Sequence, residues 1–413
     1  MTLIVKWLSS FLLIASLALA QVTPKDPACI EGFDGNIHAL DAAELDFSLR
    51  MLAAAVRSAP GQSVFFSPYS IYQALLLAYF SSANHTEANL KKTLAIEEHV
   101  PKLQVLHGYN FVRKMLGYRT NQSYEFNSAD RLFVAQDVPI RDCIQAVMRD
   151  QIQHLDFKSN PEAARQIVNG WVASETRDHI KDLIPPSGIT AATDLVLANA
   201  AYFKGKWQAQ FDPAFTKKDI FYTSPSKHTM VDMMRQEGHF QHFQSENLGV
   251  HVLEMPYLGG DISMLILLPP FTNTRLEDTL DRLTPAELAT LLAEDAPQRL
   301  VHVEIPKFSI EKQIELKPVL QQLGVGDLFD ATADLSGLAP QGHVHLDDAV
   351  HKAKIEVDEQ GSVAAAATAL FSFRSSRPLE PAQFVCNHPF VYLLYDRKLK
   401  SILFMGLYRG PNV

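Results

Sequence analysis

Residues 359–368 read EQGSVAAAAT, and the fold of the chain depends on how this run is interpreted. Apart from Val363 and Thr368, every residue from Gly361 to Ala369 is small. Four consecutive alanines are good helix material, so propensity alone favours a helix. The run lies near the end of the chain between two strongly apolar segments, where an exposed loop or a buried strand with short side chains is equally natural. The rest of the sequence has to decide between these structures.

The composition is that of a large globular protein. The chain has 413 residues, of which 47% are hydrophobic, and this is enough for a substantial core. No repeat, low-complexity block or Pro/Gly-rich linker divides it, so one large domain is favoured over several small ones. The formal net charge is -9, whereas nucleic-acid binding rests on concentrated positive charge. We therefore expect no nucleic-acid partner, although a local basic patch is compatible with this total.

The N-terminus has the pattern of a secretion signal. Lys6 precedes an apolar run over residues 7–19, and Ala18-Leu19-Ala20 forms a small-x-small cleavage site. The run is short for a bilayer-spanning helix and is interrupted by serines. We expect residues 1–20 to be a signal peptide and residues 21–35 an N-terminal extension. The mature protein should then be extracellular, with no membrane partner.

A secreted chain can form disulfides and carry glycans, so its cysteines and glycosylation triplets are informative. The chain has Cys29, Cys143 and Cys386, without a CxxC motif or a metal-ligand spacing. An oxidising compartment allows one disulfide, and the odd number leaves one thiol or an intermolecular bond. The triplets NHT and NQS predict N-glycosylation at Asn84 and Asn121.

Hydrophobic periodicity predicts an α+β protein. Apolar residues recur at helical spacing over residues 41–56, where Asp41 and Glu44 are spaced as in a capping box. Further helical patterns cover residues 104–118, 142–153 and 162–180, and strand patterns cover residues 262–268, 301–306, 385–395 and 401–408. Helices dominate the first half and strands the second, which favours helices packed on large sheets.

Local catalytic motifs were not found. The chain has no GxSxG, no HExxH and no phosphate-binding glycine loop, and Gly324-Val325-Gly326 lacks the third glycine of a dinucleotide site. The pairs His239/His242 and His343/His345 have no cysteine or carboxylate companion at ligand spacing, so surface or core histidines are the favoured interpretation. We expect no metal, no cofactor and no enzymatic activity. A dispersed catalytic triad leaves no local motif and stays as an alternative.

Seven short motifs resemble those of the serpin family and occur in the same order. They are FFSPYSI (65–71), LANAAYFKGKW (197–207), MPY (255–257), IPKF (305–308), AVHKA (349–353), NHPF (387–390) and LFMG (403–406). The resemblance identifies residues 36–413 as a single serpin domain. It implies three β-sheets, about nine helices and an exposed reactive loop near residues 360–380. It is greatest to the secreted serpins of invertebrate haemolymph, which restrain protease cascades in Toll-type immunity and melanisation.

The resemblance also implies a mechanism. In inhibitory serpins the target protease cleaves the loop, becomes acylated, and is trapped when the loop inserts as an extra strand into the largest sheet. An inserted strand places alternate side chains on opposite faces, and a charged or bulky inward residue would be costly to bury. The predicted hinge consists of Glu359, Gly361, Ser362, Ala364, Ala366 and Thr368. In it Gly361 is the pivot, and the inward residues from Ser362 to Thr368 are all small. An inhibitor is therefore favoured over a non-inhibitory carrier or chaperone-like serpin.

Two neighbouring bonds compete as the cleavage site. Family spacing counted from Glu359 places the cut at Ser375–Ser376, which would suit an elastase-like protease. Side-chain chemistry favours Arg374–Ser375, because an arginine reaches the acidic base of a trypsin-like specificity pocket. Arg377 is third, since Pro378 follows it. We expect a covalent complex with a trypsin-like serine protease and favour Arg374–Ser375.

Further positions are carried over from the family residue by residue. Those expected to control opening of the main sheet are Ser67, Ser70, Asn199, Trp207, Lys307 and His351, with Lys307 and Glu359 placed to form an ion pair. Those that correspond to a glycosaminoglycan-binding helix are Lys102, Arg113, Lys114 and Arg119, although a solvated helix face is the simpler interpretation of this sparse cluster. We expect a monomer.

Overall fold

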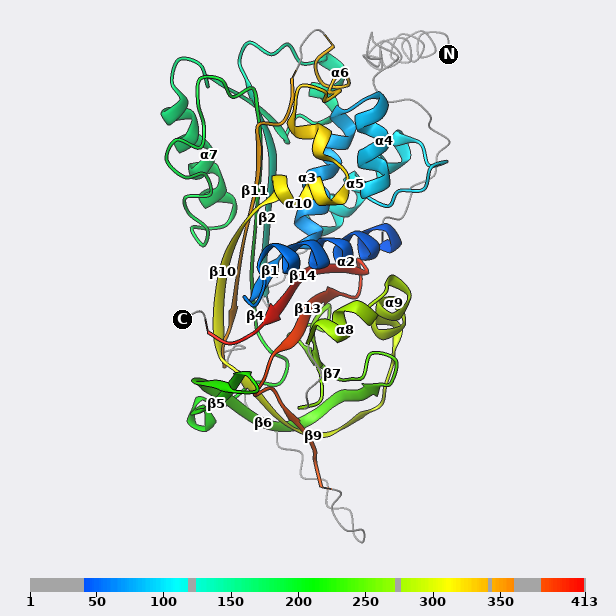
Figure 1. The fold of residues 1–413 in the computed structure, drawn as a ribbon, viewed down its shortest axis with the longest axis vertical. Coiled ribbons are helices and arrows are strands. Elements are labelled where there is room, and N and C mark those ends of the chain that lie inside the picture. The colour runs from blue at the N-terminus through cyan, green and yellow to red at the C-terminus, as the bar shows by residue number, and fades with distance from the viewer. Residues whose placement is uncertain (1–40, 118–123, 272–275, 341–343, 360–379, 412–413) are drawn as a thin grey trace, which may run out of the picture.

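The computed structural model describes residues 41–117, 124–271, 276–340, 344–359 and 380–411. Figure 1 shows an elongated molecule, with most helices gathered at one end and β5, β6 and β9 at the other. The helices of the described residues are α2 (Asp41–Ser58), α3 (Pro68–Ser81), α4 (Asn84–Thr93), α5 (Lys102–Gly117), α6 (Asp142–Val147), α7 (Pro161–Glu175), α8 (Leu276–Arg282), α9 (Pro285–Ala293) and α10 (Leu316–Leu323). Two short 3-10 helices cover Pro213–Phe215 and Gly326–Phe329.

The strands form two hydrogen-bonded networks. One has five strands in the order β10 (Phe308–Glu315), β11 (Asp348–Val357), β4 (Leu195–Gly205), β2 (Tyr124–Ala135) and β3 (Ile152–Leu155). The other has nine: β1 (Val64–Phe66), β14 (Ser401–Tyr408), β13 (Phe390–Asp396), β8 (Ile262–Leu268), β7 (Val250–Pro256), β6 (Lys227–Ser245), β9 (Gln298–Pro306) and β12 (Ala382–Val385), with β5 (Lys217–Ser224) paired to β6.

The expected three sheets correspond to these two networks because one long strand joins two of them. β6 pairs with β7 through Gln241–Ser245 and with β9 through Met233–Gln241. Its two halves thus belong to two sheets that would otherwise be separate. The nine α-helices of the described residues and these mixed sheets confirm the predicted α+β class.

Most predicted elements are found, with corrections at their ends. The helix predicted over residues 142–153 is wrong in its second half, because α6 ends at Val147 and the chain then turns into β3. The helix predicted over residues 162–180 ends at Glu175. The strand predicted over residues 385–395 is two strands, β12 and β13, which pair with different partners.

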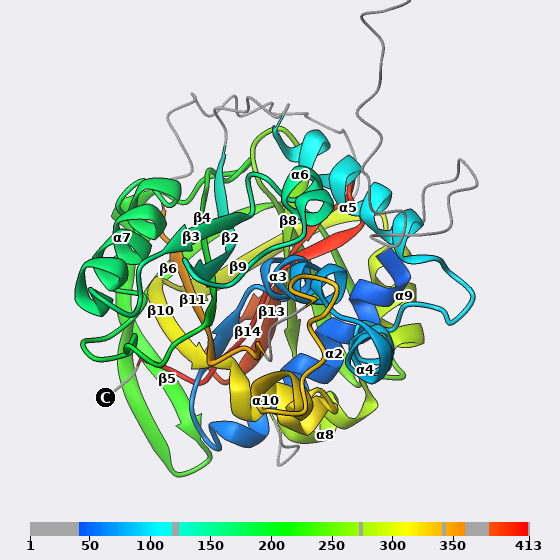
Figure 2. The same cartoon turned by 90° about the horizontal axis from the view of Figure 1, so that it is seen from above.

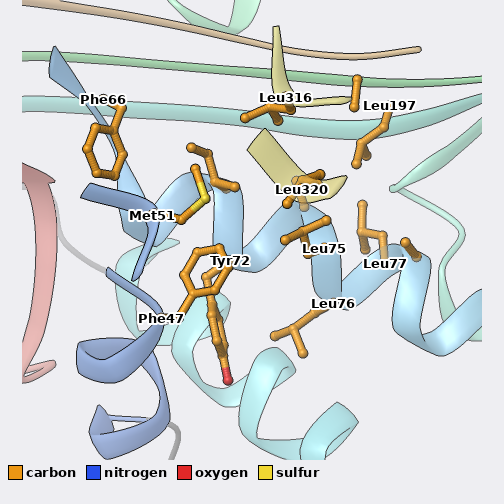
Figure 3. Packing of buried hydrophobic residues seen from close by; sticks show 14 of the residues in the cluster. Phe47, Met51, Phe66, Tyr72, Leu75, Leu76, Leu77, Leu197, Leu316 and Leu320 are labelled. Atoms are coloured by element: carbon orange, nitrogen blue, oxygen red, sulfur yellow. The ribbon is translucent and has the colours of Figure 1, made fainter. Parts of the chain in front are cut away.

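Helix α3 is the central element of the core. Its N-cap is Ser67, whose side chain accepts from the backbone N–H of Ser70, and Pro68 occupies the first turn, where its missing N–H costs nothing. All of its residues from Pro68 to Ser81 are buried. Figure 2 shows α3 behind the five-stranded sheet, and Figure 3 shows its apolar side chains packed against those of α2, β4 and α10. The labelled residues of this packing are Phe47, Met51, Phe66, Tyr72, Leu75, Leu76, Leu77, Leu197, Leu316 and Leu320.

Candidate functional site

The boundary between β4 and β11 is the place where the five-stranded sheet can be divided. The two strands run parallel and pair directly, from Asp348 opposite Val196 to Ile355 opposite Phe203. On the outer sides, β11 pairs antiparallel with β10, and β4 pairs antiparallel with β2. Strand β11 ends at Val357, just before residues 360–379. The sheet is therefore closed at the strand next to the predicted loop.

A buried polar cluster lies behind the middle of this boundary. His351 of β11 and Asn199 of β4 are directly paired in the register, and their side chains meet at 2.5 Å between His351 Nδ1 and Asn199 Oδ1. The backbone N–H of Ser67 donates to His351 Nε2 at 3.0 Å. Asn199 Nδ2 donates to the hydroxyl of Ser70 at 2.7 Å. Ser67, Ser70, Asn199 and His351 are all fully buried, so both strands are tied to the start of α3.

The electrostatic state of His351 follows from this burial. Because desolvation disfavours the imidazolium, the pKa of His351 is lowered to about 3. The neutral ring donates through Nδ1–H to Asn199 and accepts at Nε2 from Ser67. Two further hydrogen bonds extend the network: Ser67 Oγ donates to the carbonyl of Leu403 at 2.6 Å, and Asn199 Nδ2 donates to the carbonyl of Ser70 at 3.1 Å. The cluster is a satisfied network in which each group has a defined role.

One member of this network was missed by the sequence analysis. Ser128 of β2 contacts Ser70 through their hydroxyl oxygens at 2.8 Å. It extends the tether from α3 to a third strand, so β2, β4 and β11 all hold the same helix start. The signal that could have revealed it is weak, because residues 124–131 alternate too little to predict a strand.

Two contacts close the boundary at the end nearest residue 360. Trp207, just beyond β4, donates from Nε1 to the carbonyl of Asp358 at 3.0 Å. Its ring stacks on Tyr257, with centroids 4.3 Å apart. Lys204 of β4 reaches across to Glu356 of β11 at 2.9 Å. Lys204 and Glu356 were not predicted, although their opposite charges lie in strands that the motif order places in the same sheet.

The opposite end of the boundary is fastened by a single carboxylate. Asp347 precedes β11 and accepts from the backbone N–H groups of Asp194 and Leu195, at 2.8 and 3.1 Å. In return, the N–H of Asp347 donates to the carbonyl of Leu195 at 3.1 Å. The β4–β11 boundary is thus held by side chains at both ends and in the middle.

Lys307 and Glu359 form the expected ion pair, with 2.6 Å between Lys307 Nζ and Glu359 Oε2. Burial is the largest single effect on the Glu359 carboxyl and raises its pKa. The hydrogen bonds from Lys307, the backbone and Thr216, together with the Lys307 charge, outweigh burial, so the pKa lies below its usual range. The hydrogen bond to Glu359 raises the pKa of Lys307. The pair fixes the last described residue before the predicted loop to the edge of β9.

The remaining hinge and cleavage positions lie outside the described residues. They are Gly361, Ser362, Ala364, Ala366, Thr368, Arg374, Ser375 and Ser376. Arg119, Asn121 and residues 1–35 also lie outside them. Asn84 is exposed at the start of α4 and donates to Asp334 at 2.7 Å. Its predicted glycosylation therefore has a surface position.

The cations expected to bind glycosaminoglycan do not form a common surface. Lys102 lies 2.7 Å from Glu87, donates to the carbonyl of Ser82, and is 12% exposed. Burial lowers the pKa of its ammonium group. Arg113 donates to the hydroxyl of Tyr109 at 2.8 Å. Of the described cations in this group, Lys114 alone is classed as exposed.

Cys386, directly after β12, is a free thiol with 0% exposure, and burial raises its pKa well above the usual range. His242 is also buried and accepts from Arg299 at 2.8 Å, which fits the expected core histidine. Within the described ranges, His, Cys, Asp and Glu nowhere gather in a group of three able to hold a metal ion. None of the helices described there is long and apolar enough to cross a membrane.

Comparison with known proteins gives a consistent result over most of the chain. The family model described as Serpin (serine protease inhibitor) matches residues 42–411. Serine protease inhibitor 88Ea of Drosophila melanogaster is 42% identical over 385 residues, which cover 89% of this chain and 90% of that protein. Antithrombin-III of Ovis aries is 35% identical over 360 residues, which cover 85% of this chain and 77% of that protein.

Solved structures agree on the fold. Uncleaved ovalbumin has a TM-score of 0.80 at 24% identity and covers 91% of this chain and 100% of its own. A structure described as a tumour suppressing serpin has a TM-score of 0.81 at 24% identity. The match covers 90% of this chain and 99% of that one. At this identity the likeness concerns the arrangement of helices and sheets.

Proposed function

The chain belongs to the serpin family, and from this premise we propose that it is a secreted inhibitor of trypsin-like serine proteases that acts as a suicide substrate. The observation that carries the proposal is the β4–β11 boundary, which is closed, parallel and adjacent to the predicted loop. Main-chain pairing and a few polar side-chain contacts hold the boundary closed, so opening exposes backbone groups that an inserted strand can satisfy.

The direction of the strands supports insertion at this place. A segment that turned back after β11 would run antiparallel to β11. Because β4 is parallel to β11, the segment would be antiparallel to β4 as well. Insertion would replace one parallel strand pairing with two antiparallel pairings. Antiparallel pairings are slightly more stable per residue, and having two of them roughly doubles the number of inter-strand hydrogen bonds.

The length of the segment is also sufficient. β11 has 10 residues, and a strand rises about 3.3 Å per residue. Residues 360–374 can therefore follow β11 to its far end, where Asp347 holds β4. A protease attached to residue 374 would be moved to the opposite end of the sheet.

The protease serine attacks the carbonyl carbon of Arg374, the bond to the nitrogen of Ser375 breaks, and the leaving amine takes a proton from the protease's histidine. The protease is left as an ester of Arg374. Insertion then removes the ester from the geometry that hydrolysis requires. This chain contributes no catalytic group to the step.

A single experiment tests the proposal. The mature protein is incubated with trypsin, resolved on a denaturing gel, and the released C-terminal peptide is weighed. We expect a covalent complex and a peptide that starts at Ser375. A peptide that starts at Ser376 would move the bond by one residue. Clean cleavage without a complex, for trypsin-, chymotrypsin- and elastase-like enzymes alike, would mean a non-inhibitory serpin.

Secretion and pathway are part of the same proposal. The signal pattern of residues 1–20 and the exposed Asn84 support an extracellular glycoprotein. The mass of the secreted chain before and after glycosidase treatment tests secretion and glycosylation, because the chain should begin at Gln21 and lose glycan.

We further propose that the target protease belongs to an immune protease cascade of the Toll or melanisation type, and inhibition rates against recombinant clip-domain proteases test this. Heparin-like activation would have to use Lys114 and Arg119, and the inhibition rate with and without heparin tests it.

A further inference from the structure

Cys143 is the one described cysteine that is disulfide-bonded. It lies in the first turn of α6, is 3% exposed, and belongs to the same buried cluster as its neighbour Ile144. The other described cysteine, Cys386, is a free thiol. The partner of Cys143 therefore lies outside the described residues.

The cysteine content of the chain identifies this partner. The chain has three cysteines, Cys29, Cys143 and Cys386. Cys386 is fully buried in a separate hydrophobic cluster, where its backbone N–H donates to Glu304 of β9 at 2.8 Å. Figure 1 shows β9 at the opposite end of the molecule from α6. Because a disulfide joins two sulfurs about 2.05 Å apart, Cys386 is too far away, and Cys29 is the remaining cysteine.

A bond between two molecules is the competing arrangement, because an odd number of cysteines in a secreted chain allows it. The burial of Cys143 argues against this arrangement. A sulfur with so little exposed surface is out of reach of a second folded chain, whereas a segment of the same chain can be joined to it while the core forms. The chain between Cys29 and the start of α2 at Asp41 can extend to about 40 Å.

We propose that Cys29 and Cys143 form an intramolecular disulfide that fastens the N-terminal extension to α6. As the S–S bond forms, each thiol gives up one proton and one electron. The two electrons and two protons pass to the disulfide of an oxidising dithiol protein, which becomes two thiols. The inference rests on the proposed secretion, because a reducing compartment would keep both cysteines as thiols. Inhibition of a protease plays no part in it.

The bond stabilises the protein by restricting the unfolded chain. It closes a loop of about 115 residues that contains α2 and α3, and the entropic effect of a disulfide grows with the length of its loop. Neither cysteine lies on β4 or β11, so the bond does not staple the β4–β11 boundary. Cys29→Ser removes the bond without changing a described residue, and it should lower the thermal midpoint by roughly 5–10 °C.

Peptide mapping without reduction tests the pairing. The mature protein secreted from insect cells is unfolded, alkylated and digested with trypsin, and the peptide masses are measured before and after reduction. We expect residues 26–50 joined to residues 142–149, and alkylation of Cys386 alone. Alkylation of all three cysteines, a bond from Cys29 to Cys386, or two copies of residues 142–149 joined to each other would overturn the inference.

Two further measurements complete the test. Ala28→Ser, a substitution beside Cys29 that keeps both cysteines, should have the wild-type thermal midpoint, and equal midpoints for the wild type and Cys29→Ser would overturn the stabilising role. The mature chain is also refolded in a glutathione redox buffer and mapped in the same way. If cells retain the chain but refolding gives the expected pairing, secretion alone is refuted. If the chain is secreted with three free thiols, the disulfide alone is refuted.

Discussion

At the scale of single residues, His351 shows how burial and function are combined. Its ring accepts from Ser67 and donates to Asn199 only while it is neutral. In the unfolded chain a histidine takes up a proton near pH 6.5, whereas the folded protein holds the pKa of His351 at about 3. The stability that His351 contributes is therefore complete above about pH 6.5 and is lost as the pH falls toward 3.

His351→Gln should flatten the acid dependence of stability. Between pH 6.5 and pH 4 the unfolded state of the wild type gains a proton that the folded state excludes, at a cost of up to about 1.4 kcal/mol per pH unit. His351→Gln has no ionisable group at this position, so its folded and unfolded states do not differ in proton uptake there. Denaturant midpoints measured across this range check it, with His239→Gln, an exposed histidine, as the control. Parallel pH profiles for the wild type and His351→Gln would contradict the lowered pKa.

Arg374→Ala should greatly slow the formation of the covalent complex with trypsin. The specificity pocket loses its charged partner, and we expect the inhibition rate to fall by about a hundredfold or more, as for a buried recognition group left unpaired. Arg377→Ala removes an arginine three residues away and should behave like the wild type. If Arg377→Ala loses inhibition of trypsin while Arg374→Ala keeps it, the cleavage site is at Arg377. Second-order rate constants with trypsin measure both.

At the scale of elements, the β4–β11 boundary combines main-chain pairing along its length with a few side-chain hydrogen bonds that single substitutions can remove. Trp207→Phe keeps the stacked ring on Tyr257 but removes the N–H that reaches Asp358. We expect a loss of about 1 kcal/mol and faster hydrogen exchange in β11 than in β13. Trp171→Phe also loses one side-chain hydrogen bond, to Glu175, and should leave β11 unchanged. Equal exchange in all three proteins would show that Trp207 does not hold the boundary.

The sequence predicts uninterrupted apolar strands well, and a strand with a polar residue in its middle poorly. β14 and β8 are continuous apolar runs ended by turns, and both were found within their predicted ranges. β4 is buried on both faces and carries Asn199 in its middle, so neither alternation nor a purely apolar run marks it. α6 and β3 were merged because a short helix and the following strand share apolar residues. The resemblance supplied the members of the polar cluster, but the bonds between them depend on which strands become neighbours.

At the scale of the whole molecule, the proposed loop insertion predicts that the folded chain has a more stable arrangement available. After cleavage, an inserted strand would add about ten hydrogen bonds at roughly 1 kcal/mol each. At about 2 °C per kcal/mol for a chain of this size, the thermal midpoint should rise by roughly 20 °C. Calorimetry of intact and cleaved protein checks this. Ala366→Arg, cleaved in the same way, should not gain this stability because the charge would be buried; equal midpoints for intact and cleaved wild type would contradict insertion.

Cys386 gives the molecule an internal chemical reporter. The thiol is buried directly after β12, and its backbone N–H donates to Glu304 of β9 at 2.8 Å. A thiol reagent can therefore reach the sulfur only when the end of β12 separates from β9. The reaction rate of the unmodified protein then records how often the C-terminal side of the predicted loop comes loose. Labelling with a colorimetric disulfide reagent, before and after protease cleavage, follows that side of the loop through a native residue, with no engineered cysteine.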